Sequence, residues 1–431
     1  MYLCDVTLRE GDQMPGRSYS AEQKIAAGRV LNRLDVPFVQ AGFLITGEND
    51  REVIRELSAN ADADVIGLAR VTTGDVEAAL DANADVVEVF ASLSDLYLEH
   101  ALGESQSEVL DMLGDVVDLA REGGAEVHLS LADAFRTDLE RLEEAFRTFP
   151  EVPFVNLADT VGARTPSSVR TLLDSLGERV DLSRVGVHFH DDMGVATANA
   201  LAAYELGVGK ADVSVASLGE RAGNPAFEEV VVAGKTDHGD AFGIRTEELV
   251  PGCREVLDIL DEELQPRKAV LGTEVTEHES GIHTAAMLDE PAVFEPYDPS
   301  DFGGPATTAV RSGNGPNGRS ETTAAGERRT DGRAGHRVSG RAGRARPTRN
   351  RRGGGTRERA VRLVRPFPVF EFFGALPVLD ETASIDYLLH EWRHPGRRQF
   401  LAGRLVRHSA GRYVDGKFVA VRDVFGHLRD L

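Results

Sequence analysis

Two histidines separated by one residue, His188 and His190, close a short apolar run and are followed by two aspartates. Residues i and i+2 of a β-strand point to the same face, so both imidazoles would face the same space. A carboxylate, Glu10, follows an apolar run near the N-terminus, in the segment LREGDQ. Two imidazoles and one carboxylate suit a divalent metal with coordination positions left open. The alternative is that an isolated HxH pair is only two satisfied histidines of the core or surface.

The elements that must position these residues follow from an alternation of short apolar runs and helical patterns up to about residue 235. Eight such βα units predict an α/β fold, the (βα)8 TIM barrel, in which only strand eight separates strands one and seven. An open doubly wound sheet is the competing architecture, but no GxGxxG motif follows the first strand. The expected strands are Tyr2–Leu8, Phe38–Phe43, Asp64–Ala69, Val86–Ala91, Glu126–Leu131, Phe154–Ala158, Val185–His190 and Ala211–Ala216.

A third polar segment, LGERAGN at residues 218–224, follows the last expected strand. Chemistry in a TIM barrel takes place where strands end and βα loops begin, so the three segments share one rim. Together they resemble the family that contains 2-isopropylmalate synthase, homocitrate synthase and citramalate synthase. Its members show LRDGEQ or LREGEQ, HxHND and GERAGN. The resemblance covers residues 1 to about 303.

The resemblance implies a role for each matching residue at the rim. Glu10, His188 and His190 would bind the metal ion, with Asn224 close by. Arg9 would neutralise the developing alkoxide. The ion would be Mg²⁺, Mn²⁺ or Zn²⁺, and it would polarise the carbonyl group of the substrate.

Further residues are assigned by the same resemblance to the substrates. Gln13 would help to position the alkoxide, and Arg136 and Thr160 would bind the carboxylate of a 2-oxo acid. From the residues alone, Arg136 could equally be a solvated arginine at a helix start, and Thr160 could be a helix N-cap. His283, in HESGIH, would act on the methyl group of acetyl-CoA, relayed through Glu279 or Tyr297.

The expected function is a Claisen-type condensation of acetyl-CoA with a 2-oxo acid in amino-acid biosynthesis. The resemblance also implies a homodimer, because the family lends the HESGIH region from a partner subunit. The oxo acid stays open between 2-oxoisovalerate, 2-oxoglutarate and pyruvate, since LREG leans toward homocitrate synthases and GERAGN toward isopropylmalate synthases. The alternatives are a metal-dependent acyl-CoA lyase or aldolase on the same barrel, against which HESGIH argues, and an inactive remnant.

Three positions depart from the family pattern and bear on activity. Gln40 replaces a glutamate, and Ala132 replaces a carboxylate whose loss would weaken a proton relay unless Asp133 substitutes. Asp191 replaces the asparagine of HxHND and is expected to keep an oxygen facing the metal.

Charge divides the chain at Gly303. Residues 1–303 carry 23 Lys and Arg against 59 Asp and Glu, a net charge of −36, whereas the remainder carries +13. Only four of those 23 cations are lysines, a pattern that keeps a surface hydrated where salt screens repulsion. We therefore expect a halophilic protein, the alternative being an acidic surface without ecological meaning. Neither favours binding to nucleic acid.

The expected domain organisation follows these boundaries. Residues 1–240 form the catalytic barrel, and residues 241–303 form a linker and the start of a C-terminal subdomain. Residues 304–365, with 16 arginines and 12 glycines, are expected to be disordered. An RNA-binding tail or a disturbed reading frame would explain this composition, and residues 366–431 are an unassigned tail. Two cysteines outside any CxxC motif, and the lack of a signal peptide or an apolar span, predict a cytoplasmic protein without a membrane partner.

Overall fold

The computed structural model describes residues 1–278, 286–287, 290–305, 309–311, 322–324, 412–414 and 417–419. The chain forms two compact units, Met1–Ala334 and Gly335–Leu431. The functional site lies in the first unit. In the second, the described residues form a hairpin of β12 (Arg412–Val414) and β13 (Lys417–Val419).

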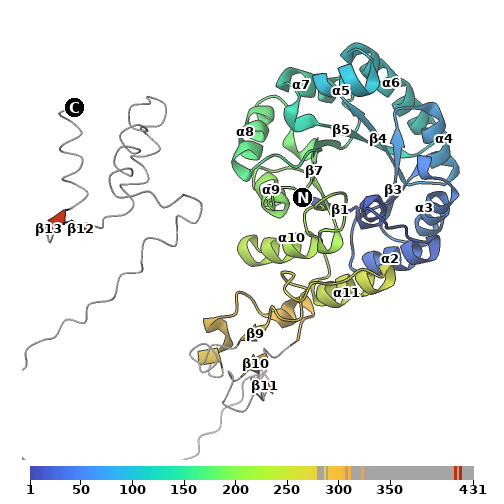
Figure 1. Cartoon of the computed structure of the whole chain (residues 1–431). Coiled ribbons are helices and arrows are strands. Elements are labelled where there is room, and N and C mark those ends of the chain that lie inside the picture. Colours follow the sequence, from blue (N-terminus) through green and yellow to red (C-terminus); the bar gives the residue numbers. More distant parts are fainter. Residues whose placement is uncertain are drawn as a thin grey trace, which may run out of the picture. The chain divides into compact units, whose positions relative to one another are not determined.

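Eight parallel strands close into a barrel in which β1 pairs with both β2 and β8 (Figure 1). The prediction of a TIM barrel is confirmed. Strands β1 and β7 are separated only by β8, which brings the ends of distant segments to one rim. The strands are β1 Tyr2–Asp5, β2 Phe38–Phe43, β3 Asp64–Arg70, β4 Val86–Ser92, β5 Glu126–Ala132, β6 Val155–Asp159, β7 Val185–Phe189 and β8 Lys210–Val213.

Helices surround the barrel and bury one apolar face each against the strands (Figure 1). In the longest of them, Val109, Leu113 and Val116 recur at helical spacing and are buried. Ser20 and Ser105 each complete a capping box that fixes a helix start. The main helices are α2 Ala21–Arg33, α3 Glu48–Asn60, α4 Thr73–Asp81, α6 Gln106–Glu122, α7 Leu139–Thr148, α8 Pro166–Gly177, α9 Ala196–Tyr204, α10 Phe227–Ala233 and α11 Leu249–Leu260.

Three strands at the site end earlier than the sequence predicts: β7 ends one residue early, at Phe189, and β1 and β8 end three residues early. Strand β1 stops at Asp5 because the Asp5 carboxylate accepts hydrogen bonds from the backbone and hydroxyl of Thr7, and helix α1 (Thr7–Glu10) follows. Strand β8 stops at Val213 because a 3-10 turn, η6 (Val215–Ser217), follows, with Ala216 and Ser217 at positive φ. Both rim loops are therefore longer than expected.

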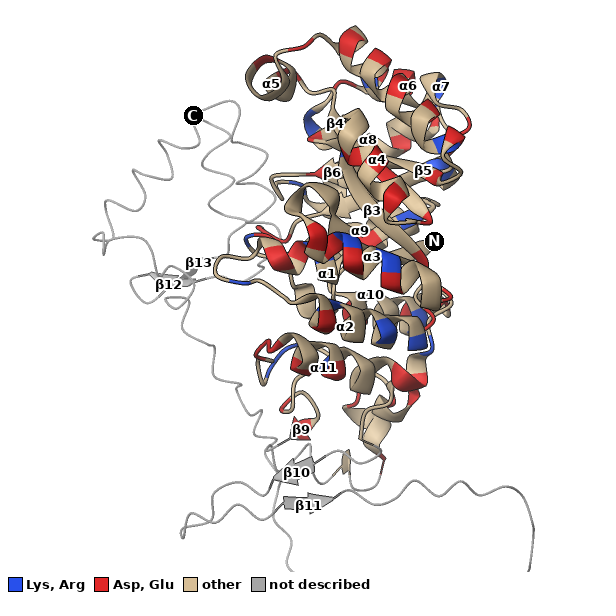
Figure 2. Cartoon of the chain, turned by 90° about the vertical axis from the view of Figure 1, so that its right-hand side faces the viewer, with Lys and Arg blue, Asp and Glu red and all other residues tan. Residues whose placement is uncertain are grey.

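Short elements complete the rim loops and the segment after the barrel. In Figure 2, the loops with α1 and α5 (Asp95–Tyr97) lie on the left of the barrel, opposite the N-terminus. Past α11, a small sheet joins β9 (Glu277–His278), β10 (Ala309–Arg311) and β11 (Thr322–Ala324). No helix among the described residues has the length and apolarity needed to cross a bilayer. The remaining short turns are η1 Gly11–Gln13, η2 Leu44–Thr46, η3 Leu98–Leu102, η4 Ala134–Arg136, η5 Leu182–Arg184, η7 Gly234–His238, η8 Thr246–Glu248, η9 Pro291–Val293 and η10 Pro299–Phe302.

Candidate metal centre

The carboxylate of Glu10 and the imidazoles of His188 and His190 meet at the rim of the barrel. One ligand atom from each lies within 4.8 Å of the others. The Nε2 of His188 is 3.5 Å from a Glu10 oxygen, and the two imidazole rings stand nearly perpendicular with their centroids 5.0 Å apart. The structure thus brings together the three residues that the sequence singled out, from α1 and the end of β7.

Hydrogen bonds fix both imidazoles from the side opposite the cluster. The Nδ1 of His188 lies 3.0 Å from the Asp212 carboxylate, and the Nδ1 of His190 lies 3.0 Å from the carbonyl oxygen of Thr160. With acceptors at Nδ1, the proton of each neutral imidazole lies there, and Nε2 keeps a lone pair for an ion.

The charges in the cluster suit a cation. Burial would raise the pKa of the Glu10 carboxyl, but Arg9 and the two imidazoles outweigh it and hold the pKa below its ordinary value. Burial, and then the nearby His188, lowers the pKa of His190 to about 4. At neutral pH the cluster therefore offers a carboxylate and a neutral imidazole, which are the metal-binding forms.

Two orphaned polar atoms test whether the cluster fits a metal ion. The Nε2 of His190 and the Oδ1 of Asn224 are buried and have no hydrogen-bond partner within the described part of the chain. Asn224 belongs to the cluster, because its Nδ2 lies 3.4 Å from the Nε2 of His188. Buried polar atoms are rarely left unsatisfied, and a divalent ion at the cluster would satisfy the His190 nitrogen. These residues fit a metal centre.

The loop after β1 is shaped by close packing and a buried ion pair. A Cβ atom on Gly11 would lie 2.8 Å from the Tyr19 ring, so a larger residue there would push the ring aside. Asp12 accepts a hydrogen bond from the backbone of Tyr19 and pairs with the fully buried Lys24. Lys24 also binds Asp50 at 2.6 Å, which ties this loop to the start of α3. Gly11 and Asp12 are therefore structural support for the loop that carries Glu10.

Arg9 points its guanidinium at the cluster and is almost fully buried. Its Nε donates to the Gln40 carboxamide oxygen at 2.6 Å, its Nη1 lies 3.5 Å from the Gln13 oxygen, and it pairs with Glu10. Gln40 and Gln13 are neutral, so Glu10 is the one of these three contacts that carries a negative charge. The structure brings Arg9 to Glu10, and Gln13 contacts Arg9; the roles expected for both toward the alkoxide stay predictions.

Arg136 and Thr160 lie close together on neighbouring rim loops. Arg136 follows β5 and pairs with Asp133 at 2.5 Å, and the Thr160 hydroxyl accepts from the backbone of Asp133 at 2.8 Å. Thr160 is not a helix cap, since α8 begins at Pro166. Tyr97 joins this group from α5, where burial and then the Asp133 charge raise the pKa of its phenol. No motif or spacing in the sequence pointed to Tyr97.

The GERAGN loop closes the site on the β8 side. A Cβ atom on Gly223, which has a φ of 91°, would lie 1.7 Å from the Ser217 carbonyl oxygen. Arg221 donates to the Thr160 carbonyl oxygen at 2.8 Å and pairs with Asp192. Arg221 therefore contacts the same Thr160 carbonyl oxygen that accepts the hydrogen bond from the Nδ1 of His190.

Some predicted residues have other contacts. The Asp191 carboxylate accepts from the backbone of Ala196, the first residue of α9, at 2.7 Å, and it does not belong to the ligand cluster. The expectation of an Asp191 oxygen facing the metal is therefore wrong. At Ala132, the carbonyl oxygen accepts from Ser92 at 2.7 Å.

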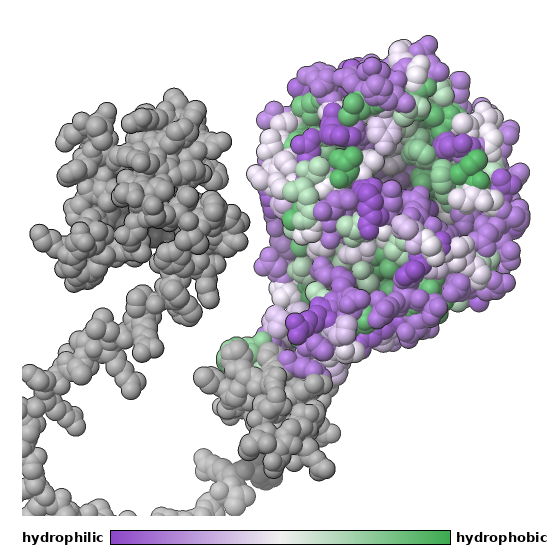
Figure 3. Space-filling view, viewed as in Figure 1, coloured by the Kyte–Doolittle hydropathy of each residue, from purple (hydrophilic) through white to green (hydrophobic). Residues whose placement is uncertain are grey.

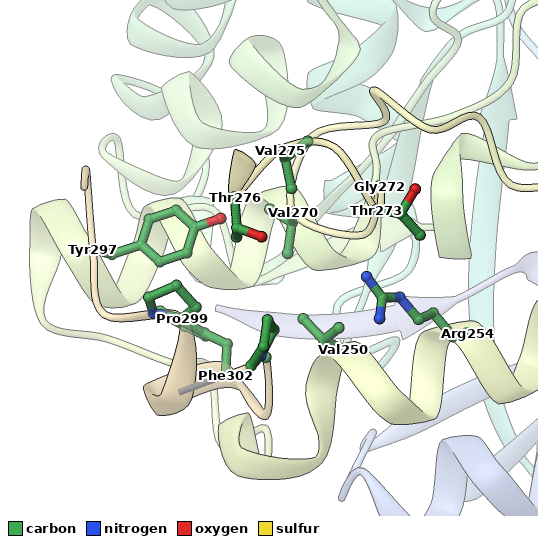
Figure 4. Close-up of a pocket in the computed structure, with 12 residues that line it drawn as sticks. Val250, Arg254, Val270, Gly272, Thr273, Val275, Thr276, Tyr297, Pro299 and Phe302 are labelled. Carbon is green, nitrogen blue, oxygen red and sulfur yellow. The ribbon is translucent and has the colours of Figure 1, made fainter. Parts of the chain in front are cut away.

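Tyr297 is the described member of the expected acetyl-CoA group. It lines a pocket of about 150 Å³ with Val250, Arg254 and Phe302, and its ring packs against Phe302 (Figure 4). None of the three ligand residues lines that pocket. The structure does not bring Tyr297 to the cluster, and its contacts give a relay role no support. Glu279 and His283 lie outside the described residues.

Comparison with known proteins decides the family. A model of the HMGL-like family matches residues 1–250. The chain belongs to this family. A model described as homocitrate synthase post-HMGL domain-like matches residues 270–317, beyond the end of the resemblance that the motifs indicated.

Two similar proteins of known sequence are synthases. A homocitrate synthase AksA of Methanopyrus kandleri is 42% identical over 69% of this chain and 76% of its own length. A 2-isopropylmalate synthase of Methanocaldococcus jannaschii is 34% identical over 70% of this chain and 59% of its own. The recognition of this group from LREGDQ, HFHDD and GERAGN is confirmed.

Solved structures agree on the fold. An HMG-CoA lyase of Bacillus subtilis superposes with a TM-score of 0.56 at 22% identity, over 62% of this chain and 95% of its own. A hydroxymethylglutaryl-CoA lyase of Pseudomonas aeruginosa gives 0.54 at 23%, over 61% and 93%. At such identities the likeness speaks for the TIM barrel alone.

Proposed function

We propose that this protein condenses acetyl-CoA with 2-oxoglutarate to form homocitrate, using a divalent ion held by Glu10, His188 and His190. The supporting observation is the buried cluster of these residues, with the unpartnered Nε2 of His190 and Oδ1 of Asn224 beside it among the described residues. The family adds the reaction class, because its relatives are acyltransferase-type synthases.

The proposed reaction has three stages: proton removal, carbon–carbon bond formation and hydrolysis of the thioester. A base takes a proton from the thioester methyl group, the methyl carbon bonds to the keto carbon, and the keto oxygen takes up a proton. Water then cleaves the thioester and releases the CoA thiol. A bound divalent ion supplies Lewis acidity that polarises the keto group.

The chain's own residues would handle the charges and protons. Arg9, held by Gln40 and next to Glu10, offers positive charge where the alkoxide develops. Arg136 and Thr160 would receive the carboxylate, with Gln13 and Asn224 helping to position the reacting groups. His283 in HESGIH is the proposed base for the methyl proton, assisted by Glu279.

The choice of 2-oxoglutarate rests on two observations. The relatives at up to 42% identity include homocitrate synthases, and the family model for residues 270–317 is described with the same enzyme. The rim also carries three arginines, Arg9, Arg136 and Arg221, each paired with an acidic neighbour, and a substrate with two carboxylates would give these guanidinium groups two further anionic partners. Pyruvate and 2-oxoisovalerate each carry one.

The proposal also includes a homodimer and a salty, reducing cytoplasm. Four exposed apolar side chains lie in the loops after β2, β4, β6 and β7, and Figure 3 looks onto this end of the barrel, where green patches lie among polar groups. They support a homodimer in which the HESGIH segment of a second copy covers the rim. The free buried cysteines support a reducing cytoplasm, and the charge of residues 1–303 supports a salty one. The four side chains are Ile45, Leu96, Val161 and Met193.

A thiol-release assay tests the proposal. Acetyl-CoA is mixed with 2-oxoglutarate, 2-oxoisovalerate or pyruvate and Mg²⁺, Mn²⁺ or Zn²⁺ in high KCl, and we expect CoA release with 2-oxoglutarate. His188→Ala should abolish it, whereas His238→Ala, which removes a histidine from η7, should not. Release with another oxo acid corrects the substrate. Cleavage of a hydroxyacyl-CoA would favour the lyase, and silence throughout would favour a remnant.

A further inference from the structure

A buried lysine lies inside the barrel beneath the metal centre. Lys210 opens β8, is completely buried, and places its ammonium 2.9 Å from the Glu88 carboxylate of β4. The same ammonium is 3.8 Å from the carboxylate of Asp212, two residues further along its own strand. The Lys210 ammonium thus contacts two buried carboxylates that lie on strands from opposite sides of the barrel.

Asp212 connects this interior group to the rim. It accepts the Nδ1 proton of His188 at 3.0 Å, and the Nε2 of the same imidazole faces Glu10 at 3.5 Å. The Asn156 amide stands between the two carboxylates, 3.2 Å from Asp212 and 3.3 Å from Glu88. A continuous set of polar contacts therefore runs from Lys210 to the proposed metal ligands.

The charge balance of this group depends on Lys210. Burial alone would lower the pKa of the Lys210 ammonium, but Glu88 and Asp212 outweigh it and raise the pKa above its ordinary value. His128 lies 3.4 Å from the ammonium, and burial and then the Lys210 charge lower the pKa of its imidazole, so it adds no second positive charge. Removing one partner of a buried ion pair leaves an uncompensated charge, which is strongly unfavourable.

We propose that Lys210 is a positioning residue for the metal centre: it balances Glu88 and Asp212 so that Asp212 holds the His188 imidazole with Nε2 directed toward Glu10. Without Lys210, Glu88 and Asp212 repel each other across Asn156, and the support of His188 loosens. This inference rests on the proposed metal site. It goes beyond it by assigning a function to a lysine that touches neither ion nor substrate.

Calorimetric titration of the metal-free full chain with Mn²⁺ alone tests the inference without relying on turnover. Lys210→Met should weaken Mn²⁺ binding by about tenfold or more, the usual effect of losing an outer residue that orients a ligand. The double variant Glu88→Gln/Lys210→Met should bind Mn²⁺ more tightly than Lys210→Met, because the repulsion is gone. A role of Lys210 in packing alone predicts no such rescue.

Two further variants keep the result decisive. Lys268→Met breaks a largely buried ion pair of 3.1 Å with Glu228, and it should lower the unfolding midpoint and leave Mn²⁺ affinity unchanged. Asp212→Asn should weaken Mn²⁺ binding even if Lys210→Met does not fold. Wild-type affinity in a folded Lys210→Met or in Asp212→Asn overturns the inference, as does equal weakening in Lys268→Met. If the wild type and His188→Ala bind Mn²⁺ alike, the metal site itself is refuted.

Discussion

Replacing Lys24 by methionine should destabilise the barrel without creating a large cavity in its core. Lys24 is fully buried in α2, and its ammonium bonds the carboxylates of Asp12 and Asp50. Methionine fills most of the same volume, so the main effect is the loss of the positive charge between two acids. The measured quantity is the free energy of unfolding from urea titrations at fixed, high KCl.

The structure places the expected loss near the lower end of the range for broken buried pairs. Removing one partner of such a pair costs about 3–5 kcal/mol. Here Asp50 keeps hydrogen bonds from the backbone of Phe43 at 2.9 Å and the hydroxyl of Thr46 at 2.5 Å. Asp12 is 27% exposed, so water can solvate it once Lys24 is gone. We therefore expect a loss of about 3 kcal/mol.

A second substitution separates charge from packing. Lys24→Met/Asp50→Asn removes the uncompensated charge of Asp50, and the asparagine oxygen can still accept from Phe43, so this variant should recover about 1–2 kcal/mol. If Lys24→Met unfolds within 1 kcal/mol of the wild type, or if the double variant is no more stable than the single one, the ion pair does not hold this loop and the reasoning is refuted.

Three further outcomes can be measured by urea unfolding. Gly11→Ala should cost about 1–3 kcal/mol because its Cβ would meet the Tyr19 ring, whereas Gly74→Ala, with no atom within 4 Å, should cost nothing; equal effects would contradict the packing argument. Burial raises the pKa of Asp5 from 3.8 to about 7. The folded state therefore holds this proton more tightly, so its contribution of about 4 kcal/mol is complete below pH 4 and lost as the pH rises to about 7. Asp5→Asn should flatten that slope, and an unchanged slope would exclude Asp5 as its source. Raising KCl from about 0.1 to 1 M, which shortens the screening length from about 10 to 3 Å, should raise the unfolding midpoint; a fall would argue against salt adaptation.

The barrel could be predicted from sequence because its signal is periodic and local. The strand Phe38–Phe43 has the bounds that its apolar run indicated, and the other strands begin within a residue of their expected starts. The ends of β1 and β8 could not be predicted in this way. At Asp5 a side chain competes with the strand for backbone hydrogen bonds, and at Ala216 the backbone takes a positive φ that no residue type demands.

In the site, too, features set by local spacing were predictable from the sequence, and contacts set by the folded barrel were not. His188 and His190 were predictable as a pair because side chains two apart share a face of any strand. The contact of His188 with Asp212 was not predictable, because it depends on how β7 and β8 are aligned, with Val187 opposite Ala211. Glu88 comes from β4, across the barrel, and only the closed geometry brings it to Lys210. Roles for His283 and Glu279 stay predictions.

The few lysines of the acidic part of the chain, residues 1–303, lie where they contact buried or partly buried acidic and polar groups. Residues 1–303 contain only four, and two of them, Lys24 and Lys210, are completely buried between carboxylates. Lys268 is 18% exposed and pairs with Glu228 and Glu229, and Lys235 donates to the hydroxyl of Thr246. Within residues 1–303, lysine is thus absent from the open surface. It is kept where a compact ammonium must bind several oxygens at once, a task for which the planar guanidinium of arginine has the wrong shape. A scarcity of lysine in composition therefore marks the remaining lysines as structural, and Lys210 is the one whose contacts continue to the metal ligands.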